Sequence, residues 1–143
     1  MKFKGKVTSV PYIKMTLSLL AELGIEHSWD DDSISISPRP FIEDKTVVVE
    51  SDWSSASYFY SFVALSPNAE ITLSSYKKNS LQGDSVLAEI YKILGVKTVF
   101  EENSMVLTNQ QPRTNNQKPL TLDLINAPDI AQTIAVTCFG LGI

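Results

Sequence analysis

The residues best suited to chemistry lie at the starts of two predicted helices. Ser9 precedes a helix that opens at Pro11, where a hydroxyl and free backbone N–H groups can donate hydrogen bonds to an anion such as phosphate. Asp129 follows Pro128 at the start of another helix, and its carboxylate suits the removal of a proton from a bound hydroxyl. Tyr12 lies close to Ser9. Each residue also has a plainer interpretation, as a helix-start residue for Ser9 and Asp129 and as a core residue for Tyr12.

These helices belong to an internal repeat of the chain. Residues 23–34 align with residues 94–105 at an offset of 71 residues. In each copy an amphipathic helix ends at a glycine, Gly24 or Gly95, where a left-handed C-cap costs little. A hairpin with an acidic turn follows each glycine. The repeat therefore predicts two copies of one supersecondary unit.

The match continues after each hairpin with a strand and then a helix that opens at an aspartate. The predicted elements are strands at 46–49, 70–73 and 120–124, and helices from Asp52 to about Leu65 and from Asp129 to about Leu141. Residues 46–108 then form one complete β-α-β-α-β-β unit between two partial units. We therefore predict an α/β (α+β) fold of βαβαββ repeat units, and an internal fragment of a longer protein.

The composition of the 143-residue chain excludes several classes of protein. A net charge of −4 and scattered lysines and arginines do not form the basic surface that nucleic-acid binding requires. The only cysteine, Cys138, excludes a disulfide and a cysteine-based zinc site, and we expect no metal or other cofactor. No apolar run is long enough to cross a membrane and no signal peptide is visible, so we expect a cytoplasmic protein.

Four short motifs carry a resemblance to a known family. They are residues 8–16 (TSVPYIKMT), 52–59 (DWSSASYF), 79–84 (NSLQGD) and 126–133 (NAPDIAQT). Their order and spacing resemble the middle third of the enolpyruvyl transferases of the shikimate pathway, the 5-enolpyruvylshikimate-3-phosphate synthase family. The resemblance runs through essentially all 143 residues. It implies an enzyme of chorismate and aromatic amino acid biosynthesis.

The resemblance also implies how the chain is divided. Members of this family are about three times longer and have two globular domains, each built of three βαβαββ units, with the active site in the cleft between them. The crossover between the domains falls near residues 49–52. We therefore expect residues 1–50 to be the end of one parent domain and residues 51–143 to be the start of the body of the other.

The family reaction moves the enolpyruvyl group of phosphoenolpyruvate to the 5-hydroxyl of shikimate 3-phosphate, and phosphate leaves through a tetrahedral intermediate. By resemblance, Ser9 binds the 3-phosphate and Tyr12 lines the shikimate site. Asp129 binds the shikimate hydroxyls and acts as the proton acceptor. From the residues alone, Asp52 with the following serines reads as a helix cap, and the motif at 79–84 as a tight turn.

The family's other active-site groups, among them most of the cations that meet the phosphates, are in regions that do not match this chain. Losing several charge-assisted contacts of about 1.5–3 kcal/mol each removes usable affinity. We therefore expect the isolated chain to be inactive. We also expect apolar edges that lack their neighbours to favour self-association.

Two other interpretations remain open at the level of sequence. One is a fragment of the related transferase that acts on UDP-N-acetylglucosamine in cell-wall synthesis and shares the repeat. The Ser-x-Pro-Tyr and Asn-Ser-x-Gln-Gly-Asp patterns at residues 9–12 and 79–84 favour the shikimate branch. The other is a stand-alone, non-catalytic binding module that reuses the same repeat.

Overall fold

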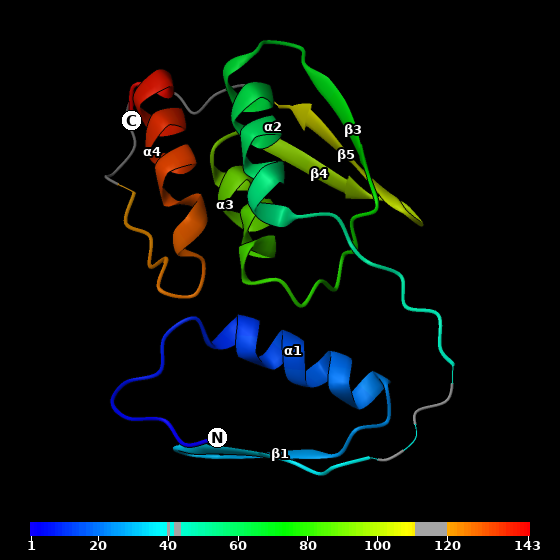
Figure 1. Ribbon diagram of the computed structural model, residues 1–143. Helices are drawn as coiled ribbons and strands as arrows, with labels where there is room; N and C mark the ends of the chain where they lie inside the picture. Colours follow the sequence, from blue (N-terminus) through cyan, green and yellow to red (C-terminus); the bar gives the residue numbers. More distant parts are fainter. Residues whose placement is uncertain (40, 42–43, 111–119) are drawn as a thin grey trace.

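The computed structural model in Figure 1 arranges the chain as two groups of elements joined by an extended connection. It describes residues 1–39, 41, 44–110 and 120–143. The N-terminal group holds a helix and a two-stranded hairpin, and the larger C-terminal group holds a three-stranded sheet with helices packed against it. Within these described ranges no helix is long and apolar enough to cross a membrane.

The N-terminal group forms as its sequence predicts. Helix α1 (Val10–Glu22) ends just before Gly24, which has a φ of 73°. A hairpin then pairs β1 (His27–Asp30) with β2 (Ser33–Ile36) in antiparallel register. The acidic turn between the two strands includes Asp31, whose φ is also positive.

The C-terminal group repeats this order around a larger sheet. It contains α2 (Trp53–Leu65), β3 (Glu70–Ser74), the 3-10 turn η1 (Gly83–Val86), α3 (Leu87–Ile93), β4 (Val96–Phe100), β5 (Ser104–Asn109), the 3-10 turn η2 (Pro128–Ile130) and α4 (Ala131–Leu141). The sheet order is β3-β5-β4, and β5 is antiparallel to both neighbours. Gly95 has a φ of 91°, so both repeat copies end a helix at a glycine with positive φ.

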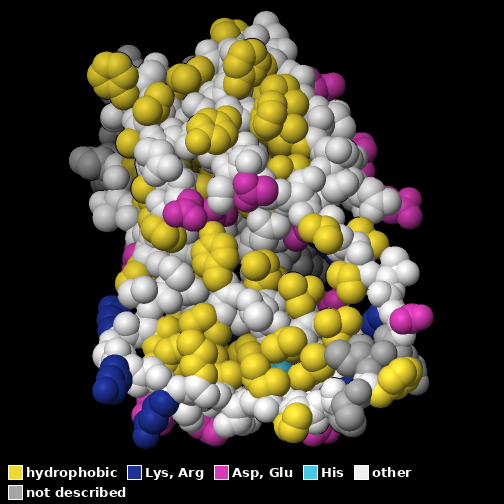
Figure 2. Space-filling model, viewed as in Figure 1, with side chains coloured by type: hydrophobic (Ala, Val, Ile, Leu, Met, Phe, Trp, Pro, Cys, Tyr) yellow, Lys and Arg dark blue, Asp and Glu magenta, His cyan; other side chains and the backbone are white. Residues whose placement is uncertain are grey.

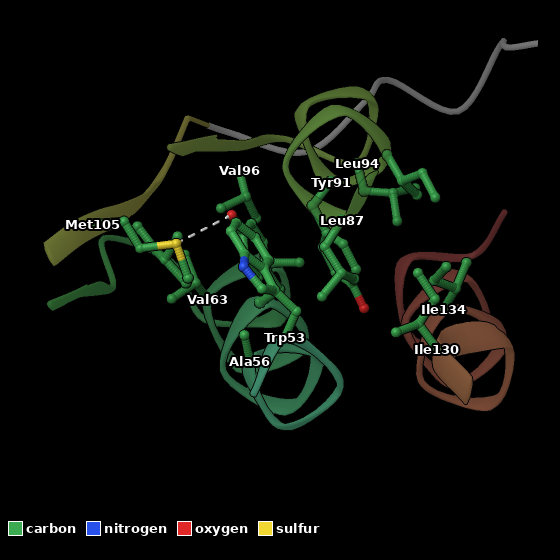
Figure 3. Close-up of a cluster of buried hydrophobic side chains, with 14 of the residues drawn as sticks. Trp53, Ala56, Val63, Leu87, Tyr91, Leu94, Val96, Met105, Ile130 and Ile134 are labelled. Atoms are coloured by element: carbon green, nitrogen blue, oxygen red, sulfur yellow. Dashed lines mark hydrogen bonds between the residues drawn. The ribbon is translucent and has the colours of Figure 1, made fainter. Parts of the chain in front are cut away.

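The core lies where α2 packs against the sheet, α3 and α4. Figure 3 shows Trp53 and Val63 of α2 near Met105 of β5, with Ile130 and Ile134 on the opposite side of the cluster. Fully burying one such side chain contributes roughly 1.5–3 kcal/mol. Two buried hydroxyl contacts join the helices in the same region, since Ser57 lies 3.0 Å from Thr133 and the Tyr91 hydroxyl lies 2.8 Å from Thr137. This core fixes the start of α2 and η2, which carry the candidate site.

Two predicted strands are wrong. Residues 46–49 and 120–124 have no strand pairing in the structure. An isolated strand needs a partner for its backbone N–H and C=O groups, and neither segment pairs with a strand among the described residues. Leu120, Leu122 and Leu124 still pack partly against the core. The predicted unit at 46–108 therefore lacks its first strand.

Asp52 caps α2, as the sequence predicts. Its carboxylate accepts hydrogen bonds from the backbone N–H groups of Ser54 and Ser55 at 3.0 and 3.1 Å, and from the Ser55 hydroxyl at 2.6 Å. The hydroxyl contact, together with the two N–H contacts, lowers the pKa of Asp52 below its ordinary value. The cap is therefore charged at neutral pH.

We expect Asp52→Ala to lower the free energy of unfolding by about 1 kcal/mol at pH 7, because the first N–H groups of α2 lose their acceptor. Since the folded-state pKa is depressed, this contribution is complete above the unfolded pKa of about 3.9 and is lost as pH falls through the folded pKa. Urea unfolding at pH 7 and about pH 3 measures the change. Asp52→Asn, which keeps a capping oxygen, is the control, and equal losses for both variants at pH 7 would contradict the capping role.

Candidate functional site

Three segments that are distant in the sequence converge beside η1. A Cβ atom added to Gly83 would lie 2.3 Å from the backbone oxygen of Asn126 and 3.2 Å from Cβ of Pro11. The backbone at the start of η1 thus lies directly between the segment before η2 and the first turn of α1. This contact brings the predicted site residues of both groups of elements to one place.

Ser9 lies at the N-cap of α1 but does not act as an ordinary capping serine. Its backbone is in the left-handed region, with φ 54° and ψ 37°, and its side chain makes no capping hydrogen bond. Its carbonyl accepts a hydrogen bond from the N–H of Tyr12 at 3.1 Å. Left-handed backbone in a residue other than glycine is uncommon and is found more often at functional sites. The hydroxyl is therefore left for another partner in front of the helix.

Tyr12 is half-buried and faces the C-terminal group. Its pKa is raised, first by burial and then by the negative charges of Asp84 and Asp129. The hydroxyl also interacts with Ser54, which acts in the opposite direction and lowers the pKa. The charge of Asp129 of η2 therefore reaches Tyr12 of α1, and both residues lie in segments that converge at Gly83.

Asp129 lies in η2 between the buried residues Ala127 and Ile130, while its own side chain is exposed. The two buried neighbours anchor the turn, and Pro128 restricts its backbone. The carboxylate can therefore reach a ligand from a fixed position. Figure 2 shows acidic side chains in the middle of this face, between two areas of hydrophobic side chains.

Asp84 is a residue of this site that the sequence did not single out. It is 1% exposed, and the Ser54 hydroxyl donates to its Oδ2 at 2.5 Å. Its Oδ1 is buried without a hydrogen bond of normal length and angle in the described part of the chain. Burial raises the pKa of Asp84, and the charges of Asp129 and Asp52 add to that rise. The sequence placed Asp84 in a tight turn and Ser54 in a helix cap, and nothing local indicates that their side chains meet.

The motif at residues 79–84 also does more than form a turn. Glu50 accepts hydrogen bonds from the Trp53 indole at 2.9 Å and from the Ser80 hydroxyl at 2.8 Å. The amide of Gln82 donates to the carbonyl of Ser51 at 2.8 Å and accepts from the backbone N–H of Trp53 at 2.9 Å. The motif therefore holds the end of the connection between the two groups of elements against the start of α2.

The electrostatic environment of the site is negative. Asp84, Asp129 and Asp52 are the charged groups that act on Tyr12 or on Asp84, and no basic side chain is among those acting on them in the described residues. Surface hollows of 710 and 640 Å³ are not lined by Ser9, Tyr12 or Asp129, although Glu50, Asp52 and Gln82 line the second. The site offers hydroxyl donors and carboxylate acceptors, which suit a polyhydroxylated ligand better than a bare anion.

A known family matches nearly the whole chain. Residues 1–140 match the model of the family described as EPSP synthase (3-phosphoshikimate 1-carboxyvinyltransferase). The chain belongs to the EPSP synthase family. The mixed helix and sheet architecture is consistent with an EPSP synthase-type fold, so the family resemblance and the fold class predicted from the sequence are confirmed.

Similar proteins come from distant organisms. The chain is 39% identical to a 3-phosphoshikimate 1-carboxyvinyltransferase of Bacteroides fragilis over 100% of its length and 34% of that protein. It is 30% identical to the 3-phosphoshikimate 1-carboxyvinyltransferase of Methanosphaera stadtmanae, over 93% of this chain and 31% of the relative. It is 36% identical to the chloroplastic 3-phosphoshikimate 1-carboxyvinyltransferase of Petunia hybrida, over 92% of this chain and 26% of the relative. The chain thus spans about a third or less of these EPSP synthases. All three names favour the shikimate branch over the cell-wall enzyme.

We expect Gly83→Ala to displace residues 126–129, because the new methyl group meets a backbone oxygen that has no side-chain freedom. The cost should be about 1–3 kcal/mol of unfolding free energy. Urea unfolding and the amide NMR shifts of these residues measure the change.

Gly140→Ala is the matched control. Its added Cβ would meet the flexible end of Leu65 at 2.6 Å, and alanine favours the helix, so the loss should be smaller. A Gly83→Ala chain with unchanged stability and unchanged shifts at 126–129 would contradict the close contact.

Proposed function

We propose that this chain contributes part of the shikimate 3-phosphate site of an enzyme that transfers enolpyruvyl from phosphoenolpyruvate to the substrate's 5-hydroxyl. The observation that carries the proposal is the convergence at Gly83 of the first turn of α1 and the segment before η2, in a chain of the EPSP synthase family. In this assignment Ser9 binds the 3-phosphate, Tyr12 lines the sugar site, and Asp129 binds the hydroxyls and accepts a proton.

The chemistry of each group supports its assignment. The Ser9 hydroxyl is not used by the helix cap and can donate to a phosphate oxygen in front of α1. The exposed carboxylate of Asp129 can accept the proton of the 5-hydroxyl as that oxygen bonds to the enol carbon of phosphoenolpyruvate. A proton added to the methylene carbon completes the tetrahedral intermediate. Loss of phosphate from the enol carbon and of a proton from the new methyl group then restores the double bond and leaves the enol ether on the 5-oxygen.

Cations for the phosphates must then come from outside this site. The charges named as acting on Tyr12 and Asp84 within the described part of the chain are negative, and phosphoenolpyruvate brings further negative charge. The curated relatives are about three times as long as the matched segment, which leaves room for the basic groups elsewhere in such a protein. We therefore propose that the isolated chain binds the sugar phosphate weakly and does not turn over.

We also propose that the connection through residues 49–52 is the crossover between two parent domains, with residues 1–50 ending one and residues 51–143 starting the other. The separation of α1 and the β1–β2 hairpin from the remaining elements supports this division (Figure 1). The hydrogen bonds of Glu50 and Gln82 fix the crossover on the C-terminal side. The cytoplasmic location stays a prediction, and the Petunia relative is named as chloroplastic.

The test of the substrate assignment is a two-dimensional amide NMR titration of the chain with shikimate 3-phosphate. Localised shifts are expected at residues 9–12 and 126–130, because these residues surround the site. Shikimate without its phosphate should bind more weakly, and Ser9→Ala should reduce this difference between the two ligands. An enzymatic assay of the same sample should detect no turnover.

Two results would contradict these proposals. A well-dispersed spectrum without shifts at millimolar shikimate 3-phosphate would overturn the substrate assignment. Measurable product from the pure chain would overturn the proposed inactivity.

The exposed apolar side chains of α2 and α4 support a second proposal, that the isolated chain self-associates. Tyr58, Phe62, Val136 and Phe139 are 59–87% exposed and lie on these two helices. Sedimentation velocity should show association that grows with concentration and decreases in Phe139→Asp. Ile36→Asp, at an exposed position of β2, is the control, and a monomer at every concentration would refute the proposal.

A further inference from the structure

Asp84 is the buried ionisable group that the proposed chemistry does not use. It is 1% exposed, and only one of its oxygens, Oδ2, has a hydrogen bond of normal geometry in the described part of the chain. A buried carboxylate without full pairing costs free energy, so its presence calls for an explanation. Its position in η1, at the convergence with α1 and η2, suggests one.

Groups from each neighbouring segment act on this carboxylate. Ser54 of α2 donates to Oδ2, and Tyr12 of α1 interacts with the carboxylate through its hydroxyl. Asp129 of η2 and Asp52, which precedes α2, add negative charge. Of these four residues, only Tyr12 comes from the N-terminal group of elements. Tyr12 also belongs to the proposed substrate site.

We propose that Asp84 is a positioning residue that holds the Tyr12 hydroxyl beside Asp129. Ser54 orients the carboxylate through Oδ2, and the carboxylate in turn interacts with the Tyr12 hydroxyl. The phenol is thereby fixed at the face that also carries the Asp129 carboxylate. The effect on ligand binding rests on the proposed function, whereas the Asp84–Tyr12 contact does not.

The contact also has a mechanical consequence. Tyr12 lies in the first turn of α1, next to Pro11, which packs against Gly83. The Tyr12–Asp84 contact therefore ties α1 to η1 at the point where the Pro11 side chain already packs beside Gly83. The position of Ser9 in front of α1 then depends on the same contact.

The first test measures the pKa of Tyr12 in the 143-residue chain by NMR of ring-labelled tyrosine. Asp84→Asn should lower the pKa of Tyr12 toward its ordinary value, because the charge and the contact that raise it are removed. Tyr60, whose pKa burial raises to about 12, should not change, since Asp84 is not among the groups acting on it. Asp52→Asn is the charge control, because Asp52 acts on Asp84 but is not among the groups acting on Tyr12.

The reciprocal variant decides the question if Asp84→Asn does not fold. Tyr12→Phe removes a half-buried hydroxyl only, and it should raise the pKa of Asp84 further, because the contact with Tyr12 lowers that pKa. Carboxyl-carbon NMR of labelled aspartate measures this change. An Asp84 pKa that is the same with and without the Tyr12 hydroxyl would overturn the positioning role.

The second test is binding of shikimate 3-phosphate. Asp84→Asn should weaken binding by about 2- to 10-fold, as expected for one lost hydrogen bond. The loss should disappear when Tyr12 is already phenylalanine, because Asp84 acts through that hydroxyl. An equal loss in both backgrounds would show that Asp84 has a general structural role and would overturn the proposal.

The two hypotheses fail in different ways. If the unmodified chain does not respond to shikimate 3-phosphate but the Tyr12 and Asp84 pKa values change as expected in the variants, the substrate assignment falls and the positioning contact stands. If ligand binds at residues 9–12 and 126–130 but neither pKa changes, the substrate assignment stands and the positioning role falls.

Discussion

The close backbone approach at Gly83 is the constraint on which the rest of the site depends. Only a residue without a Cβ allows η1 to lie against the carbonyl of Asn126 and the ring of Pro11. This packing brings the first turn of α1 to the turn that carries Asp129. Side chains from two groups of elements can then share one small region, although the connection between them is long and extended (Figure 1).

Buried polar groups give this convergence its specificity. Hydrophobic packing in the core of α2, α3 and the sheet is strong but not directional. The hydrogen bonds of Ser54 with Asp84, and those of Glu50 and Gln82 around the start of α2, need defined distances and angles. They therefore select one arrangement of the motif at 79–84 against the connection between the two groups of elements. A polar motif that reads as a turn in the sequence is a support for the site in the structure.

Local chemistry made much of the fold predictable. The helix stops at Gly24 and Gly95 follow from the freedom of glycine to adopt positive φ, and the cap at Asp52 follows from the unpaired N–H groups of a helix start. The hairpins follow from alternating side chains around polar turns. The strands expected at 46–49 and 120–124 did not form, because a strand depends on a partner that local sequence does not supply.

The sequence by itself determined the family, the repeat, the main helices and hairpins, and the residues Ser9, Tyr12 and Asp129 as candidates. These depend on residue type, spacing and neighbours along the chain. The tertiary structure alone decided that the charge of Asp129 acts on Tyr12, that Ser54 turns its hydroxyl to Asp84, and that Asp84 is buried. Contacts of this kind join residues far apart in the sequence, and they are set by how the helices and turns pack, which no local pattern of residues encodes.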